Sequence, residues 1–131
     1  MTILGLDHAQ ITIPTGAEQQ AKAFYLDLLG LVEIEKPEAL QGRGGFWMKA
    51  GPMEVHIGTE KGVDRMQTKA HLAYQVPDVN PWRETLEQAG VDIIEAAAIP
   101  GAERFEFRDP FGNRVELIQR LHPQARTGDS Q

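Results

Sequence analysis

Three histidines and one glutamate lie at matching places in two similar stretches of this 131-residue chain. The stretches extend from Leu6 to Gly58 and from Ala70 to Gln119, and each opens and closes on a strand-like run that carries one of these side chains. The four residues are His8, His56, His71 and Glu116. Neutral imidazole nitrogens and carboxylate oxygens bind divalent first-row metal ions and leave positions open for water or substrate. The sequence therefore predicts one shared site for a divalent metal ion, which would be Zn, Ni, Fe, Mn or Co.

The composition excludes several other kinds of chemistry. The chain has no cysteine, so disulfide bonds, a thiolate nucleophile and a cysteine-bound zinc are ruled out. The formal net charge of -6 and the lack of a Lys/Arg cluster disfavour binding to nucleic acid, which requires a basic face. No apolar run approaches the ~20 residues that cross a bilayer, and the N-terminus does not resemble a secretion signal. We expect a soluble, cytoplasmic protein with a small-molecule substrate and no nucleic acid or membrane partner.

The first stretch predicts one strand, one helix and three further strands. Apolar and polar residues alternate from Leu6 to Ile13, which is the period of a strand with one dry face and one polar face. Apolar residues at helical spacing follow Thr15-Gly16, and Gly30 stands where a helix commonly ends. We expect an amphipathic α-helix of about three to four turns between them. Further strands are predicted at 31–36, 46–50 and 53–58.

The second stretch repeats this order of elements. A strand is predicted from His71 to Val76, and Asn80-Pro81 has the residue types of a helix start, with Asn80 as the N-cap. Gly90 is expected to end that helix. Three more strands are predicted at 91–95, 104–108 and 114–119. Ligands carried by strands are held rigidly, so the metal site would be organised before an ion binds.

Other side chains near the predicted ligands are candidates for binding the substrate. Two glutamines share the polar faces of the histidine strands, and arginines in the chain could hold an anionic group. Aromatic strand residues, Trp47 among them, could wall a pocket, although such residues more often lie in the core. The six substrate-binding candidates are Gln10, Gln75, Arg43, Phe46, Arg104 and Phe105.

Several short segments carry a resemblance to a known family. They are Leu6-Asp7-His8, Ala23-Phe24-Tyr25 with Leu28-Leu29-Gly30-Leu31, Glu54-Val55-His56, Ala70-His71-Leu72 and the run Asp109-Pro110-Phe111-Gly112-Asn113-Arg114-Val115-Glu116-Leu117. With these segments the chain resembles, over nearly all of residues 3–120, the vicinal oxygen chelate superfamily. That superfamily includes glyoxalases, bleomycin-resistance proteins and extradiol dioxygenases.

The resemblance implies an α+β fold in which two βαβββ modules form curved mixed sheets around a central cavity. It implies one glyoxalase-like domain over residues 1–120, with module 1 at about 3–60, module 2 at about 68–120, and a polar tail at 121–131. One such module leaves an open sheet edge and an open face that another module must cover. We therefore expect a homodimer in which His8 and His56 of one subunit meet His71 and Glu116 of the other.

The resemblance also implies a chemistry, in which a metal ion acts as a Lewis acid on a substrate that chelates it through neighbouring oxygens. The expected activity is that of a glyoxalase-like lyase or isomerase, with Glu116 as a further candidate for the general base. His56 departs from the glyoxalase pattern, which has a carboxylate at this place. Two alternatives stay open: a metal-free protein that binds or sequesters a ligand, as bleomycin-resistance proteins do, and an extradiol-type dioxygenase.

Overall fold

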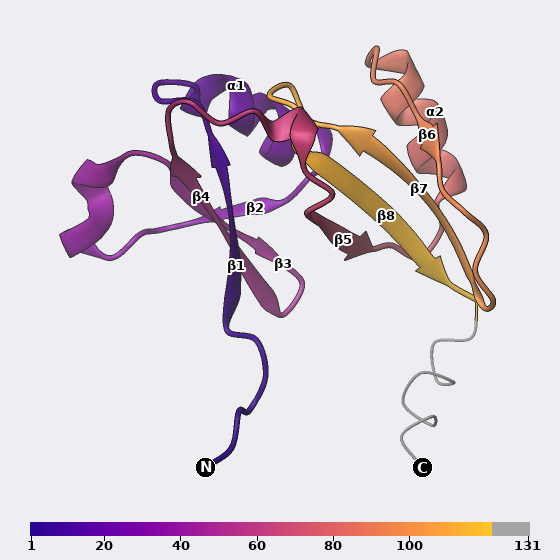
Figure 1. Ribbon diagram of the computed structural model, residues 1–131, viewed down its shortest axis with the longest axis horizontal. Coiled ribbons are helices and arrows are strands. Elements are labelled where there is room, and N and C mark those ends of the chain that lie inside the picture. Colours follow the sequence, from indigo (N-terminus) through magenta and orange to yellow (C-terminus); the bar gives the residue numbers. More distant parts are fainter. Residues whose placement is uncertain (122–131) are drawn as a thin grey trace. The chain divides into compact units, whose positions relative to one another are not determined.

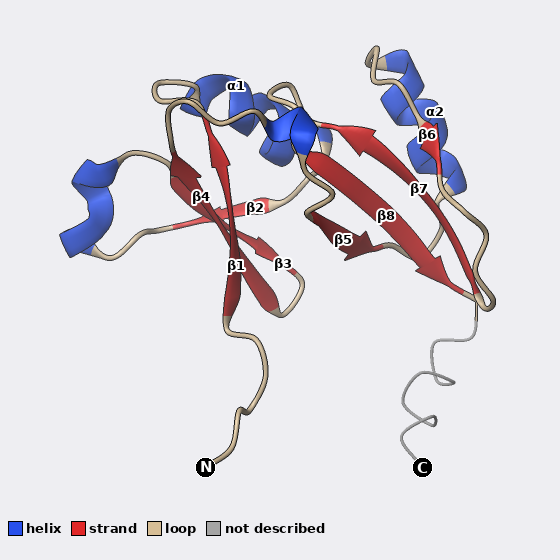
Figure 2. Cartoon of the chain, viewed as in Figure 1, coloured by secondary structure: helices blue, strands red, loops and turns tan. Residues whose placement is uncertain are grey.

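The computed structural model describes residues 1–121 of the chain, which divides into two compact units, Met1–Asp64 and Arg65–Gln131. Each unit consists of a strand, a helix and three further strands (Figures 1 and 2). None of the helices in this part of the chain has the length and apolar character needed to cross a membrane. Apart from Leu121, the predicted polar tail lies outside the described residues.

Unit 1 contains one four-stranded mixed sheet. Its elements are β1 (His8–Ile13), α1 (Glu18–Lys22), η1 (Ala23–Leu28), β2 (Val32–Ile34), η2 (Glu38–Arg43), β3 (Phe46–Ala50) and β4 (Met53–Thr59). The strand order is β1-β4-β3-β2, with β1 parallel to β4 and the other neighbours antiparallel. The parallel pair follows from the helical crossover that separates β1 from the later strands.

The helix of unit 1 is not a regular α-helix throughout. It begins as the short α-helix α1 and continues as the π-helix η1, in which the backbone N–H of Leu29 donates to the carbonyl of Phe24. This wider turn keeps Phe24 and the adjacent Tyr25 both buried. Gly30, with a positive φ of 78°, follows the helix, as the sequence predicts.

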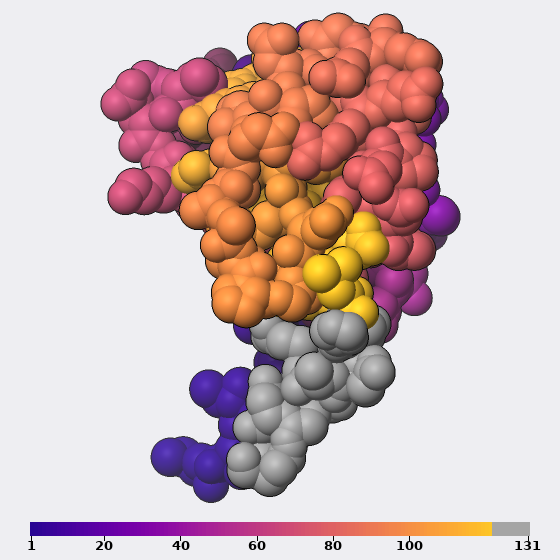
Figure 3. All heavy atoms as spheres, turned by 90° about the vertical axis from the view of Figure 1, so that its right-hand side faces the viewer, coloured from indigo at the N-terminus to yellow at the C-terminus, as the bar shows by residue number. Residues whose placement is uncertain are grey.

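Unit 2 repeats the architecture of unit 1. Its elements are η3 (Arg65–Gln67), β5 (His71–Gln75), α2 (Asn80–Gln88), β6 (Ile94–Glu95), β7 (Ala102–Arg108) and β8 (Arg114–Arg120). The strand order is β5-β8-β7-β6, with β5 parallel to β8 and the other neighbours antiparallel. Figure 3 shows α2 and the segment around β6 at the surface of this unit.

Two details of unit 2 differ from the sequence prediction. Asn80 is not the N-cap of α2, because its backbone N–H donates to Asp78 Oδ1 at 3.0 Å and Asn80 already lies in the helix. The predicted strand at 91–95 is reduced to the two residues of β6, which pair with β7.

Each sheet has one apolar face and one polar face. In unit 1 the core contains Phe46, Met48 and Ile57, and in unit 2 it contains Phe105 and Phe107. Since side chains alternate along a strand, the residues between these core positions lie on the opposite face of the sheet. The prediction of an α+β fold with two βαβββ modules is confirmed.

Candidate metal centre

The strand registers place the predicted ligands at equivalent positions in the two units. In unit 1, Gln10 of β1 is paired with His56 of β4, and His8 comes two residues earlier on β1. In unit 2, Ala73 of β5 is paired with Glu116 of β8, and His71 comes two residues earlier on β5. His8 is therefore the counterpart of His71, and His56 is the counterpart of Glu116.

The next strand adds a third side chain to each row. Trp47 of β3 is paired with His56, and Glu106 of β7 is paired with Glu116. The two rows are thus His8–His56–Trp47 in unit 1 and His71–Glu116–Glu106 in unit 2. The first row is aromatic, whereas the second holds two carboxylates.

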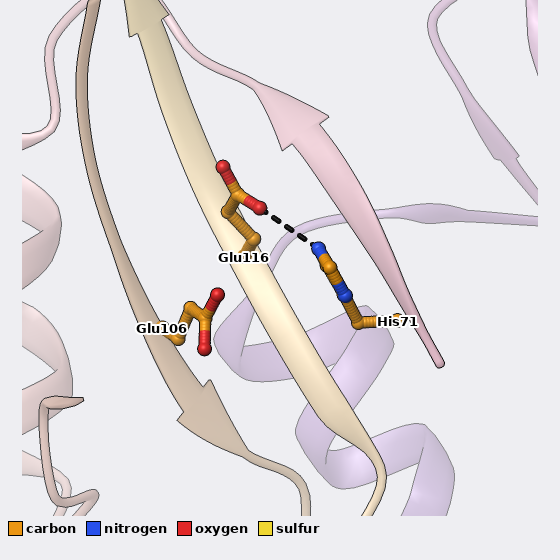
Figure 4. A group of neighbouring side chains, drawn as sticks. All are labelled: His71, Glu106 and Glu116. Carbon is orange, nitrogen blue, oxygen red and sulfur yellow. Dashed lines mark hydrogen bonds and ion pairs between the residues drawn. The ribbon is translucent and has the colours of Figure 1, made fainter. Parts of the chain in front are cut away.

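The row of unit 2 has the donor atoms of a metal site (Figure 4). His71 Nε2 lies 2.9 Å from Glu116 Oε1, and one ligand atom from each of His71, Glu106 and Glu116 falls within 4.8 Å of the others. Both glutamates are 5% exposed. His71 Nδ1 is 3.0 Å from the carbonyl oxygen of Lys69, which fixes the orientation of the ring and directs Nε2 toward the carboxylates.

Two arginines compensate the buried carboxylates. Arg114 Nε donates to Glu106 Oε1 at 2.7 Å, and Arg104 Nη1 donates to Glu116 Oε2 at 3.3 Å. Arg104 is itself anchored, because its Nε and Nη2 atoms both donate to the carbonyl oxygen of Ala97. Two guanidinium groups thus balance two carboxylates, which makes the burial of these charges tolerable.

The row of unit 1 is a stack of three rings. The indole of Trp47 lies on the imidazole of His56 with ring centres 3.6 Å apart and planes 3° apart. His8 also stacks on His56, with ring centres 4.1 Å apart and planes 19° apart. His56 is 4% exposed, and its Nε2 lies 3.0 Å from Glu54 Oε1.

Each of the three imidazoles has an acceptor beside at least one ring nitrogen. His8 Nδ1 lies 2.8 Å from Asp7 Oδ1, which leaves Nε2 of that ring available to a metal ion. Metal-binding histidines commonly donate their second ring N–H to a carboxylate or a backbone carbonyl. The surroundings of His8 and His71 therefore suit a metal ligand.

Three of the predicted substrate-binding residues lie on exposed parts of the chain. Gln10 is on β1, and its side-chain amide lies over Gly58 of the neighbouring strand. Gln75 is at the end of β5, two positions beyond Ala73, and so shares the face that carries His71. Arg43 is exposed and is the last residue of η2, so it belongs to neither row.

The two predicted aromatic contacts lie on the core face of their sheets. Phe46 is buried, with the Lys22 ammonium 5.3 Å from its ring centre. Phe105 is buried in unit 2, with the Arg83 guanidinium 4.8 Å from its ring centre. In unit 1 the aromatic residue on the same face as the candidate ligands is Trp47, which follows Phe46 in the sequence.

Glu106 is the member of the cluster that sequence reasoning missed. A charged residue between Phe105 and Phe107 reads as a solvent-exposed position on an alternating strand. Its position relative to the tight turn that begins at Asp109 was the available signal. A hairpin closed by this turn pairs Glu106 with Glu116 on the next strand. In the structure this turn is held by the Asp109 carboxylate, whose Oδ1 accepts from the backbone N–H groups of Phe111 and Asn113.

Tyr74 is half-buried, with its hydroxyl oxygen buried, and lies on the other face of β5 from His71. Burial, and secondarily the charge of Asp109, raise the pKa of its hydroxyl well above the ordinary value. Within residues 1–121 its hydroxyl has no hydrogen-bond partner. Tyr74 therefore stays protonated and neutral near pH 7.

The fold and these rows define a protein built from two βαβββ modules with imidazole and carboxylate side chains at equivalent strand positions. The family model of the Glyoxalase/Bleomycin resistance protein/Dioxygenase superfamily matches residues 5–117. The chain belongs to this superfamily, as the sequence resemblance implied.

Solved structures share the fold. A Bacillus anthracis protein assigned to the glyoxalase family is 40% identical, with a TM-score of 0.84 over 92% of this chain and 98% of that chain. A variant of the fosfomycin resistance protein FosX from Listeria monocytogenes, solved with Mn(II) and 1S,2S-dihydroxypropylphosphonic acid, is 20% identical, with a TM-score of 0.76 over 95% and 98% of the two chains. Among curated proteins, Glyoxylase I 4 of Arabidopsis thaliana is 22% identical over 125 residues, which is 88% of this chain and 70% of that protein.

Proposed function

We propose that the protein is a metal-dependent, glyoxalase-like enzyme of the lyase or isomerase type. Its substrate would be a small molecule that chelates the metal ion through two neighbouring oxygens. The observation that carries this proposal is the contact between His71 Nε2 and the buried Glu116 Oε1, with Glu106 beside it. Imidazole and carboxylate atoms gathered at this spacing are a donor set for a divalent first-row ion.

The ligands would be drawn from the four residues predicted by the sequence, His8, His56, His71 and Glu116. The donor set fits an ion such as Mn(II), Fe(II), Co(II), Ni(II) or Zn(II), because oxygen and nitrogen atoms suit all of these. FosX of Listeria monocytogenes, which has this fold, was solved with Mn(II) and a phosphonic acid that carries two hydroxyl groups. That relative supports a metal ion here but does not identify it.

The protein's own residues would hold and orient the reacting groups. A bound divalent ion would supply Lewis-acid stabilisation of negative charge on the substrate oxygens. Glu116, fixed between His71 and Arg104, is the proposed catalytic carboxylate and would accept the proton that the substrate loses. Arg104 and the exposed Arg43 are the proposed contacts for an anionic substrate group, and Gln10 and Gln75 for its hydroxyl or carbonyl oxygens.

Two copies of the chain would complete each site. We propose a homodimer in which the His8 row of one subunit faces the His71 row of the other, giving two sites per dimer. The proposal follows from the sequence resemblance and from the register, since each unit supplies one half of the predicted ligand set.

The test begins with untagged protein stripped of metal and titrated with Mn²⁺, Zn²⁺, Ni²⁺, Co²⁺ and anaerobic Fe²⁺. We expect about one ion per chain, and turnover of an α-hydroxycarbonyl compound or a hemithioacetal only in the metal-loaded form. Turnover of a catechol with dioxygen by the Fe²⁺ form would instead identify the dioxygenase alternative. A folded protein that takes up none of these ions would overturn the proposal and favour the metal-free ligand-binding alternative.

A further inference from the structure

We propose that Arg114 binds an oxyanion group of the substrate, with Arg108 as a second positive charge beside it. The group would be a carboxylate, a phosphonate or a phosphate. The inference rests on the proposed metal-dependent function and deepens it, because it names the substrate class as anions that also chelate the metal ion. All the observations that carry it lie within unit 2.

A row of basic side chains lies next to the candidate ligands of unit 2. Arg114 of β8 is paired with His71 of β5 on one side and with Arg108 of β7 on the other. Arg114 is two residues from Glu116 and on the same face of the sheet, so the two rows are roughly 7 Å apart along the strand. A group bound at the basic row would therefore lie beside the donor atoms of His71 and Glu116.

One edge of the Arg114 guanidinium group is free. Its Nε donates to Glu106 Oε1 at 2.7 Å, whereas its Nη1 and Nη2 atoms make no hydrogen bond within residues 1–121. The buried Glu106 carboxylate, which Figure 4 shows beside Glu116, thus fixes the guanidinium plane. The Arg114 side chain is 28% exposed. Its two terminal N–H groups present parallel donors that match the two oxygens of a carboxylate or phosphonate.

Arg104, two residues before Glu106 on β7, has no such free edge. Its Nε and Nη2 atoms donate to the carbonyl oxygen of Ala97, and its Nη1 atom donates to Glu116 Oε2. An anion would bind at Arg104 only after one of these hydrogen bonds was broken. Arg114 can bind an anion and keep its contact with Glu106.

Arg108 carries a positive charge that forms no ion pair in the part of the chain that the structure describes. Its Nη1 atom donates to the carbonyl oxygens of Gly112 and Arg65 at 2.9 and 3.4 Å, and both acceptors are neutral. Arg108 also stands directly opposite Arg114. Like charges opposite each other on neighbouring strands destabilise a sheet, and a bound oxyanion would offset this repulsion.

The charge of this face favours an anion further once a metal ion is bound. Three arginines, Arg104, Arg108 and Arg114, flank the two carboxylates of Glu106 and Glu116. The face therefore has one positive charge in excess, and a divalent ion would add two more. A substrate that brings a second negative group besides its chelating oxygens balances this charge better than a neutral chelator does.

The first experiment titrates metal-free protein with methylphosphonate, an oxyanion that has no second group to chelate a metal ion. Calorimetry should show saturable binding to the wild type and at least about tenfold weaker binding to Arg114→Gln. Arg120→Gln is the control, because it removes the same charge at the far end of β8, and it should bind like the wild type. No binding by the wild type, or equal losses in the two variants, would overturn the inference and leave the proposed function intact.

The second experiment compares the enantiomers of malate with those of lactate on the Mn²⁺-loaded protein. Both acids chelate a metal ion through a hydroxyl and the neighbouring carboxylate, and malate adds a second carboxylate for Arg114. One malate enantiomer should bind at least about tenfold more tightly than either lactate. Arg114→Lys keeps the charge beside Glu106, and thus the fold, but lacks the bidentate edge. It should weaken malate binding about fivefold and leave lactate binding nearly unchanged.

Equal affinities for malate and lactate, or an equal effect of Arg114→Lys on both, would contradict the inference. A wild-type protein that takes up no Mn²⁺ would overturn the proposed function instead. In that case the methylphosphonate titration still decides whether Arg114 binds an oxyanion.

Discussion

At the scale of single residues, the cluster in unit 2 depends on charge balance. Glu106 and Glu116 are buried side by side, and their charges are compensated by Arg114 and Arg104. Removing one partner of a buried ion pair lowers the free energy of unfolding by far more than the pair contributes, because the remaining charge is buried without a compensating partner. Arg104 is the more sensitive partner, since it contacts Glu116 and lies 3.9 Å from Glu106.

Arg104→Met should destabilise the metal-free protein by about 2 kcal/mol, because it leaves the Glu116 carboxylate with His71 alone. Urea unfolding at about pH 7 gives the free energy of unfolding. Saturating Mn²⁺ should recover part of the loss, since a bound cation restores the missing positive charge. Arg83→Met is the control, because Arg83 pairs with the exposed Glu95 and its loss should have a much smaller effect. An Arg104→Met protein as stable as the wild type would contradict this account.

The residue types of the candidate site were predictable from the sequence, but the sheet face on which each side chain lies was predictable only in part. His56 and Glu116 stand on alternating strands, and the structure sets them in register with Gln10 and Ala73. Phe46 was preferred to Trp47 as a pocket residue, yet a shift of one residue along a strand moves a side chain to the other face. The stack on His56 also depends on the pairing of β3 with β4, which a single sequence does not specify.

At the scale of elements, unit 1 has a close contact between a loop and the sheet. Gly45, which precedes β3, has a φ of +77°, and a Cβ atom there would overlap the carbonyl oxygen of Ile57. The backbone N–H of Gly45 donates to Glu18 Oε2 at 2.9 Å, which ties the start of α1 to the same loop. The helix and the entry to β3 are therefore coupled through one glycine and one carboxylate.

Gly45→Ala should destabilise the protein by more than about 3 kcal/mol, because the new methyl group adds a clash with β4 to the strain of a positive φ. Gly62→Ala is a matched control: Gly62 has a φ of +74° but open space around it, so it should cost only the backbone strain of about 1–2 kcal/mol. Thermal and urea unfolding of both variants measure the difference. An equal loss of stability in the two variants would show that the close contact with Ile57 does not add to the cost of Gly45→Ala.

The contribution of Glu18 should depend on pH. The hydrogen bond from Gly45, and next that from its own backbone N–H, lower the pKa of Glu18 below its ordinary value of 4.5. A lowered pKa in the folded state means that the ionised form stabilises the fold above about pH 4.5, and that this stabilisation is lost as the pH falls through the lower, folded-state pKa. Glu18→Gln should therefore cost about 1 kcal/mol at pH 7, and the cost should shrink as the pH falls below the ordinary carboxyl pKa of 4.5.

The measurement is urea unfolding of wild type and Glu18→Gln at several pH values. Glu38→Gln, altered at an exposed glutamate of η2, serves as the control and should show little difference at any pH. A loss in Glu18→Gln that stays the same from pH 7 to the lowest pH at which the protein is folded would rule out a role for the charge.

The sequence predicted the positions of the elements better than their geometry. The strand at 46–50 agrees with β3, and Gly30 and Gly90 follow their helices as expected. The π-helix η1 was not predicted, because apolar residues at Phe24, Tyr25 and Leu28 fit an α-helical stripe equally well. Only the tertiary packing that buries Phe24 and Tyr25 together distinguishes the two helix types.

At the scale of the whole molecule, two units of the same topology carry unlike rows at equivalent positions. Unit 1 presents stacked rings and unit 2 presents compensated carboxylates. The duplicated architecture was predictable because the alternating and helical patterns recur in the same order. How two copies associate was not, because the sequence shows which faces are polar and not what covers them.

The proposed dimer predicts that two inactive variants complement each other. His8→Ala and Glu116→Ala should each lose most metal binding, because each removes a ligand from both sites of a homodimer. After the two proteins are mixed, unfolded and refolded together, random pairing should restore about one quarter of the wild-type sites. Bound Mn²⁺ is measured after gel filtration.

If instead both halves of each site came from the same chain, mixing would restore nothing. A mixture of Glu116→Ala with His71→Ala is the control. Both changes lie in unit 2, so every site in every dimer lacks a ligand and no recovery is expected.

The indole that covers His56 gives the protein a built-in optical probe. The chain has two tryptophans, Trp47 and Trp82, and only Trp47 belongs to the ring stack. Trp82 lies on α2, so Trp82→Phe would leave a protein whose tryptophan emission comes from the stack alone. Any event that parts His8 from His56, or brings a paramagnetic ion beside them, would then be seen as a change in fluorescence, in real time and without a label.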